Sequence, residues 1–166
     1  SFFTDAIDEL FPKCKFIHLV RHPGDFVRSG IRRNYYKNHD YDDGRIVPSN
    51  IAREVWESYS QIQKVGWLWN ETNQLIENWK ENINSEKMIT VKSEDLFTNP
   101  SEFEKICYFC DLNKMEIDKI NKLIKSPINV QKKGSFPPYD QWTSHQKKEL
   151  YTIAPLGEKY GFWSGS

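Results

Sequence analysis

The sequence has little cysteine. It holds three cysteines in 166 residues, and an odd number in a chain of this length does not fit a framework of paired disulfides. Cys107 and Cys110 fall at helical spacing among apolar neighbours, which favours buried free thiols over a redox pair or a zinc site. We therefore expect a reducing compartment, and on that basis a cytoplasmic location.

An excess of charge of either sign is also lacking, because 23 basic side chains balance 23 acidic ones. No overall field then draws the chain to nucleic acid or to an anionic membrane surface, so recognition of an anion must be local. No apolar run approaches the roughly 20 residues that a membrane-spanning helix needs. The hydrophobic content of 38% is enough for one globular domain with a core.

The most informative stretch begins with an apolar run at residues 15–20. Its β-branched and aromatic residues predict a strand that is buried on both faces of a parallel sheet. A turn is expected next, because Pro23 favours extended geometry before it, Gly24 tolerates unusual dihedral angles and Asp25 can cap a helix. The helix should start near Gly24 or Asp25 and run to about Tyr36.

A strand, a tight turn and a helix start form a corner where free main-chain N–H groups and the positive end of the helix dipole favour an anion. Arg21 stands at the end of the expected strand, and its planar guanidinium can hold two phosphate oxygens. Ser29 can offer a hydroxyl from the same side of the helix. The pattern indicates a phosphate-binding corner, and the alternative is a structural turn with a surface ion pair.

The spacing of Arg21 and Ser29 resembles the 3′-phosphate-binding segment of sulfotransferases that use 3′-phosphoadenosine 5′-phosphosulfate (PAPS). In that family an arginine at a strand end is followed eight residues later by a serine, as in this sequence. The two side chains hold the 3′-phosphate of the donor nucleotide there. The resemblance therefore implies a donor-binding role for Arg21 and Ser29.

A second stretch, residues 88–100, resembles the second strand of the same family, its Tyr-Glu-Asp-Leu segment and an Asn-Pro helix start. The chain departs from the pattern at Ser93, which stands where the family often has a tyrosine that contacts adenine. The order of the two stretches along the chain is the family's order. This agreement strengthens the resemblance.

A third stretch, residues 131–135 followed by Trp142, resembles the Arg-Lys-Gly loop and the downstream tryptophan of the family. That loop closes over the 3′-phosphate, which implies cationic roles for Lys132 and Lys133 and a close backbone approach at Gly134. The alternative for this loop is a solvated basic turn.

The resemblance implies a sulfotransferase that moves a sulfuryl group from PAPS to an acceptor hydroxyl or amine, without a metal. The reaction would be an in-line displacement in which positioning and charge neutralisation dominate, as in phosphoryl transfer. A carbohydrate, a small alcohol and a protein tyrosine all stay open as acceptors.

Residues 1–20 contain no glycine and so no loop of the Lys-x-Gly-Ser/Thr kind, which holds the 5′-phosphosulfate in the family. His18 lies within the expected strand, where a satisfied buried imidazole is favoured over a general base. We therefore expect residues 1–166 to form a single sulfotransferase-like domain that is incomplete at its N-terminus. Such a chain should be inactive alone, with no catalytic residue and only the nucleotide end of the donor site.

Two other classes of function remain open. One is a non-catalytic domain of the same fold that binds an adenosine nucleotide or another partner through the Arg21 corner, since this role needs no upstream loop. The other is a nucleotide kinase of the related P-loop architecture, although the absence of a Walker-type loop counts against it.

The expected fold class is α/β, a partial P-loop-NTPase-like sulfotransferase fold that is helix-rich with a small parallel sheet. Apolar spacing predicts one long amphipathic helix over residues 50–83, with Trp56 and Trp67 off its stripe, packed on neighbouring elements or lining an acceptor pocket. Shorter helices are expected at residues 2–10, 100–111 and 114–125 and after Thr143. An exposed sheet edge or an unfilled groove is the expected liability, and self-association would cover it.

Overall fold

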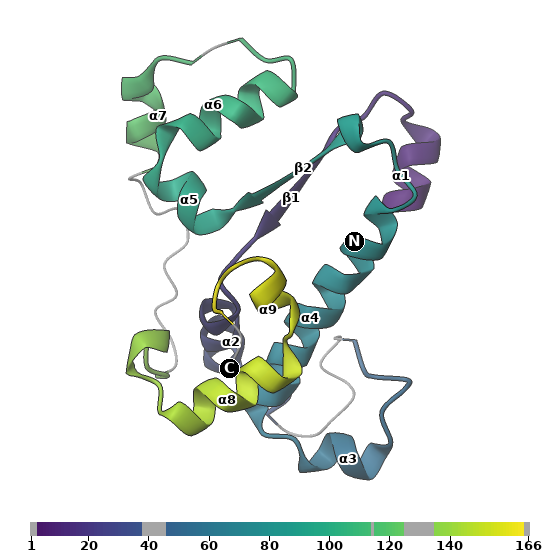
Figure 1. Ribbon diagram of the computed structural model, residues 1–166, viewed down its shortest axis with the longest axis vertical. Coiled ribbons are helices and arrows are strands. Elements are labelled where there is room, and N and C mark those ends of the chain that lie inside the picture. Colours follow the sequence, from purple (N-terminus) through teal and green to yellow (C-terminus); the bar gives the residue numbers. More distant parts are fainter. Residues whose placement is uncertain (1–2, 38–45, 114, 125–134, 165–166) are drawn as a thin grey trace. The chain divides into compact units, whose positions relative to one another are not determined.

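The computed structural model describes residues 3–37, 46–113, 115–124 and 135–164. The chain divides into two compact units, each built from two stretches of sequence. Unit 1 holds Ser1–Arg21 and Gln74–Gln131, and unit 2 holds His22–Asn73 and Lys132–Ser166. Helix α4 (Gln61–Lys80) begins in unit 2 and ends in unit 1, so both units share it (Figure 1).

Unit 1 contains two parallel strands, β1 (Phe16–Val20) and β2 (Met88–Lys92). They lie side by side in Figure 1, and their register runs from Phe16 opposite Met88 to Val20 opposite Lys92. Both strands occur where the sequence predicts them. The molecule is helix-rich with a small parallel sheet, which confirms the expected helix-rich α/β fold class.

One face of β1 is buried and the other is open. His18 and Val20 are buried, whereas Ile17 is 45% exposed and Leu19 is 49% exposed. The prediction that this strand is buried on both faces is therefore wrong. Phe16 lies on the covered side and packs edge-on against Trp79 of α4, with ring centroids 4.5 Å apart. Side chains alternate between the two faces of a strand, so Phe16 shares the covered face with His18 and Val20.

The helices of unit 1 are short, and the start of α6 follows directly from its sequence. Asn99 caps this helix, because its Oδ1 accepts from the main-chain N of Ser101 at 3.1 Å and Pro100 occupies the first turn. Cys107 of α6 is buried with a free thiol, as predicted, whereas Cys110 has a free thiol but is only half-buried. The helices of this unit, besides the end of α4, are α1 (Thr4–Leu10), η1 (Ser85–Lys87), α5 (Ser93–Thr98), α6 (Pro100–Phe109) and α7 (Ile117–Ile124).

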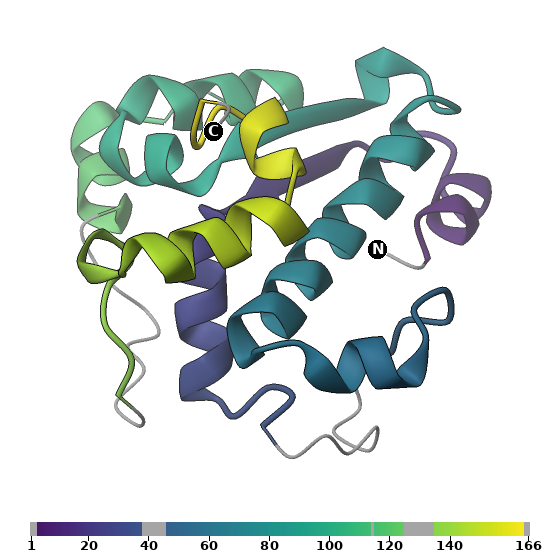
Figure 2. The same ribbon diagram turned by 60° about the horizontal axis from the view of Figure 1, so that its bottom comes forward.

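The core of unit 2 forms where α2 and α8 meet the first part of α4. Val27, Val65 and Leu150 have no exposed surface. Gly66 allows close contact, because a Cβ there would lie 2.8 Å from Cγ2 of Ile153. Figure 2 shows α8 lying across α2 and this part of α4. The helices of unit 2 are α2 (Pro23–Arg32), α3 (Arg53–Ser58), η2 (Tyr139–Gln141), α8 (Ser144–Ile153) and α9 (Leu156–Lys159), besides the start of α4.

Helix α2 is shorter than the sequence predicts, since it ends at Arg32 and not near Tyr36. Asn34 and Tyr36 have positive φ angles of 60° and 53°, in the left-handed region. A residue in that region cannot continue a right-handed helix. The helix therefore stops before the apolar pattern does.

The single long helix predicted over residues 50–83 is also wrong, because the structure breaks it into α3 and α4. Tyr59 is extended, with ψ 139°, and ends α3. Ser60 and Gln63 then form a reciprocal capping pair: Ser60 Oγ accepts from Gln63 N at 3.2 Å, and Gln63 Oε1 accepts from Ser60 N at 2.9 Å. A Ser-x-x-Gln helix start thus interrupts a continuous apolar stripe.

Trp56 and Trp67 pack against each other inside unit 2. Both are buried, and their rings meet edge-on with centroids 5.2 Å apart. Tyr36 adds a second edge-on contact to Trp56 at 5.3 Å. The two tryptophans therefore belong to the core of unit 2.

A polar contact joins the C-terminal helices to α4. Thr143 and Gln146 form the capping box that the sequence predicts at the start of α8. Asn70 of α4 is only 8% exposed, and its Oδ1 accepts from the main-chain N of Leu156 at 3.2 Å.

No helix among the described residues is both long and apolar enough to cross a membrane.

Lys64 is a buried cation in the core of unit 2. Its side chain is 1% exposed, and Nζ lies 5.6 Å from the centre of the Trp56 ring. Burial lowers the pKa of Lys64 from its ordinary value, while Glu57 partly opposes this shift. The cation–π contact offsets part of the cost of removing the charge from water.

We expect Lys64→Met to raise the free energy of unfolding at neutral pH, because methionine keeps the apolar stem and removes the buried charge. The unfolded chain holds the Lys64 proton up to its ordinary pKa of 10.5, and the folded protein releases it at lower pH. Unfolding in that window takes up a proton, so wild-type stability rises with pH and the advantage of the variant shrinks. Urea denaturation at several pH values between neutral and 10.5 measures this.

The matched control is Lys148→Met, since Lys148 is exposed on α8. It should leave stability within about 0.5 kcal/mol of wild type at every pH. If the gain in the free energy of unfolding of Lys64→Met does not change with pH, the charge of Lys64 is not what destabilises the wild-type protein.

Candidate functional site at the start of α2

The two strands end at the same edge of the sheet in unit 1. Val20 pairs with Lys92, so Arg21 and Ser93 directly follow the paired strands at their carboxyl ends. Open α/β sheets bind their ligands at this edge. Arg21 is exposed and Ser93 is buried. The structure thus brings together Arg21 and the start of the second motif stretch, which are far apart in sequence.

Helix α2 begins with a cap that the sequence analysis assigned to another residue. His22 is the N-cap, and its Nδ1 accepts from the main-chain N of Gly24 at 3.0 Å. The prediction that Asp25 caps the helix is wrong, because Asp25 lies within the first turn. Pro23 occupies the first helical position, where its missing N–H costs nothing.

The main-chain donors of the first turn of α2 are all used internally. The carbonyl oxygen of His22 accepts from the N–H of Asp25 at 3.1 Å and of Phe26 at 3.0 Å. Gly24 donates to the His22 ring, and Pro23 has no N–H. The expectation that free N–H groups bind an anion here is therefore wrong for this structure. An anion at this corner can still be attracted by the helix dipole and by side chains.

Ser29 lies further along α2 and is half-buried in unit 2. Arg21 is the last residue of the N-terminal stretch of unit 1. Lys132, Lys133 and Gly134, the other predicted site residues, lie outside the described residues. Of the five predicted positions, the structure therefore describes these two.

The segment that follows the predicted Lys-Lys-Gly loop is attached to α2. Nε of Arg28 donates to the carbonyl oxygen of Phe136 at 3.0 Å. Trp142 is buried, and its Nε1 donates to the carbonyl oxygen of Pro137 at 3.0 Å. The rings of Phe136 and Trp142 also meet edge-on, with centroids 5.4 Å apart. Trp142 thus holds the segment in shape, and Arg28 ties it to the helix that carries Ser29.

Tyr139 of η2 packs on the first turn of α2. A Cβ on Gly24 would lie 2.3 Å from Cδ2 of Tyr139, so only glycine leaves room for this ring. The Tyr139 and His22 rings lie 4.5 Å apart, and the Tyr139 hydroxyl is 2.8 Å from the hydroxyl of Tyr151. Burial and the Tyr151 hydrogen bond raise the pKa of Tyr139, so its phenol stays protonated at neutral pH.

The sequence analysis assigned no role in this region to three residues, His22, Arg28 and Tyr139. A signal for His22 was present, because the residue before a proline at the first helical position is the N-cap. Histidine is not a preferred cap, which hid the signal. Nothing local marks the partners of Arg28 and Tyr139, since their contacts cross about a hundred residues of sequence.

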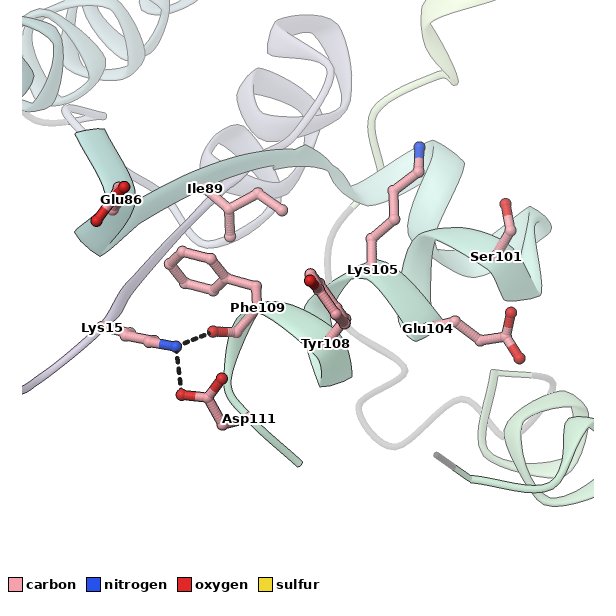
Figure 3. A pocket seen from close by; sticks show the side chains of 9 residues that line it. All are labelled: Lys15, Glu86, Ile89, Ser101, Glu104, Lys105, Tyr108, Phe109 and Asp111. Atoms are coloured by element: carbon pink, nitrogen blue, oxygen red, sulfur yellow. Dashed lines mark hydrogen bonds and ion pairs between the residues drawn. The ribbon is translucent and has the colours of Figure 1, made fainter. Parts of the chain in front are cut away.

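A separate groove of about 1020 Å³ lies along β2 and α6 in unit 1 (Figure 3). Lys15 is at its edge, where Nζ donates to the carbonyl oxygen of Phe109 at 2.6 Å and to Asp111 at 2.5 Å. Three carboxylates and two lysines line the groove, which does not suit a polyanionic nucleotide. Its lining residues, none a predicted site residue, are Lys15, Glu86, Ile89, Ser101, Glu104, Lys105, Tyr108, Phe109 and Asp111.

The comparisons with known proteins gave one match. Residues 1–116, more than half of the chain, match a family model described as the sulfotransferase family. No curated protein and no solved structure matches the chain. The matched range includes Arg21, Ser29 and both strands, and it ends before the third motif stretch. Within the described residues, no three His, Cys, Asp or Glu side chains gather as a metal site needs.

Gly24→Ala should destabilise the protein, because the added methyl group would overlap the Tyr139 ring. We expect the free energy of unfolding to fall by about 1–3 kcal/mol, as for other overpacked sites. Without this overlap, alanine in a helix would stabilise by roughly 1 kcal/mol relative to glycine. Urea denaturation of the purified chain measures the difference.

The same substitution in a Tyr139→Leu background is the control. Removing the ring should abolish most of the cost of Gly24→Ala, so the two changes are strongly coupled. An equal cost in both backgrounds would mean that Tyr139 does not restrict this position.

Proposed function

Because the chain belongs to the sulfotransferase family, we propose that it acts with PAPS as the sulfuryl donor and that Arg21 and Ser29 hold the 3′-phosphate. One observation carries this proposal: the register of β1 and β2 places Arg21 and Ser93 after paired strands at the edge where such sheets bind ligands. Arg21 is exposed there, and its guanidinium suits a phosphate.

We further propose that Lys132, Lys133 and Gly134 close over the same phosphate. Support comes from the residues that follow them, since Arg28 ties Phe136 to the helix that carries Ser29. The two lysines that precede this anchored segment in the sequence add the positive charge that a nucleotide with two phosphate groups requires. At the start of α2 itself, side chains supply the recognition, because the main-chain donors there are already used.

The reaction proposed is transfer of a sulfuryl group from PAPS to an acceptor hydroxyl or amine. This chain would supply the nucleotide end of the donor site, with residues 1–166 acting as one sulfotransferase-like domain. No general base is assigned to it, and His18 is a buried core residue whose Nδ1 lies 4.0 Å from Oε1 of Glu77. The proposed acceptors are a carbohydrate, a small alcohol and a protein tyrosine.

The second candidate is a domain of the same fold that binds an adenosine nucleotide without transferring sulfate. Residues 1–20 contain no glycine for a phosphosulfate loop, and nucleotide binding through the Arg21 corner does not require one. Transfer of labelled sulfate from PAPS to a phenol or a sugar by this chain would exclude the non-catalytic role.

Arg21→Ala should weaken binding of adenosine 3′,5′-bisphosphate by about 2 kcal/mol or more, through loss of a charge-assisted pair of hydrogen bonds. Isothermal titration calorimetry measures this affinity directly. Adenosine 5′-monophosphate, which lacks the 3′-phosphate, should bind more weakly to wild type and should not distinguish the variant.

Arg53→Ala is the matched control, because Arg53 is an exposed arginine of α3 that pairs with Glu57. It removes the same charge at a distant place in the sequence and should leave the affinity unchanged. Equal binding by wild type and Arg21→Ala would remove Arg21 from the site.

Ser29→Ala should cost less, about 1 kcal/mol of bisphosphate binding, since it removes one hydroxyl donor. If both side chains hold the same phosphate, the double variant Arg21→Ala/Ser29→Ala should lose less than the sum of the single losses. Strict additivity in the same calorimetric titrations would place the two residues at different groups.

A further inference from the structure

His22 accepts several hydrogen bonds from the main chain at the start of α2. Its Nδ1 accepts from Gly24 N at 3.0 Å, and its carbonyl oxygen accepts from the next two main-chain donors. One residue therefore satisfies every N–H of the first turn. His22 also follows Arg21 directly in the chain, so the same cap defines where the backbone leaves Arg21 and enters the helix.

Aromatic side chains from two later segments hold the imidazole in place. Its ring centroid lies 4.5 Å from that of Tyr139, 5.1 Å from that of Phe162 and 6.2 Å from that of Trp163. Trp163 in turn packs on Tyr151 at 4.7 Å. The ring is thus oriented by packing, and its accepting nitrogen is turned back toward Gly24.

The cap requires one particular protonation state. Nδ1 can accept a hydrogen bond only while it carries no proton, so the neutral tautomer with the proton on Nε2 is the one that fits. A protonated imidazole would lose this bond and would place a positive charge at the positive end of the α2 dipole. The geometry of the first turn therefore depends on a neutral His22.

We propose that His22 is a positioning residue for the donor site: its neutral imidazole fixes the first turn of α2, and phosphate binding is left to side chains. This inference rests on the proposed function of Arg21 and Ser29. It assigns His22 no direct contact with the nucleotide, because its accepting nitrogen is bonded to Gly24.

Within the part of the chain that the structure describes, charged and titratable groups near the imidazole lie on α2, η2 and α8. Asp25 lies in the first turn of α2 itself. Tyr139 and Tyr151 share a hydrogen bond, and Nζ of Lys147 lies 5.3 Å from the centre of the Tyr139 ring. Burial and the Tyr151 hydrogen bond raise the pKa of Tyr139, so its phenol does not titrate in the range where histidine does.

Two variants separate the cap from the ring packing. His22→Asn keeps a strong N-cap acceptor and loses the ring, whereas His22→Phe keeps an aromatic ring and loses the acceptor. Titration calorimetry with adenosine 3′,5′-bisphosphate on the full chain should show about tenfold weaker binding for His22→Phe and a loss within about threefold for His22→Asn. Thermal unfolding of each variant reports whether it is folded at the titration temperature.

The pH profile supplies a readout that a purely structural role of the ring would not move. Between about pH 8 and pH 5.5, wild-type affinity should fall relative to His22→Asn, because only the wild-type cap is lost on protonation. The phosphate groups of the ligand change their protonation equally in both experiments. The ratio of the wild-type affinity to the His22→Asn affinity therefore removes their contribution. This comparison uses two proteins that keep the cap at pH 8, and it holds even if His22→Phe does not fold.

Three results would overturn the proposal while leaving the donor site intact. They are wild-type affinity in a folded His22→Phe, a ratio that does not change with pH, and a wild-type affinity that rises in acid relative to His22→Asn. The last would identify a charged imidazole as a direct phosphate ligand. Failure of wild type to bind the bisphosphate at all would instead overturn both this inference and the proposed function.

Discussion

The parallel pairing of β1 and β2 is the interaction on which the arrangement of the site depends. Parallel strands point their carboxyl ends the same way, and a register of Val20 opposite Lys92 brings two distant motif stretches to one edge. Arg21 and Ser93 follow these strands directly. A shift by one residue would send alternating side chains to the other face and exchange buried His18 and Val20 for exposed Ile17 and Leu19.

Features with local causes were predictable from the sequence. The two strands, the Asn99 cap and the Thr143–Gln146 capping box each depend on a few neighbouring residues, and the structure has all of them. The family match also agrees with motifs that occupy short stretches. The Ser60–Gln63 helix start was equally readable, but the apolar stripe that crosses it masked the break.

The remaining features depend on contacts between residues far apart in the chain. The open face of β1 reflects which helices pack on the sheet, and a strand pattern alone does not reveal this. The role of His22 as a cap depends on rings at positions 139, 162 and 163 that orient its imidazole. For the proposed phosphate corner, the use of the main-chain donors by His22 could therefore not be predicted from the sequence.

The division of each unit into two stretches of sequence has a consequence for biosynthesis. Val27 and Val65 of unit 2 pack in a core completed by Leu150, and Asn70 bonds to the main chain of Leu156. Because a ribosome makes the chain from its N-terminus, α2 and α4 emerge long before their partners in α8 and α9. Their apolar faces stay uncovered during that interval. Unit 2 therefore reaches its native packing only after α8 and α9 have been synthesised.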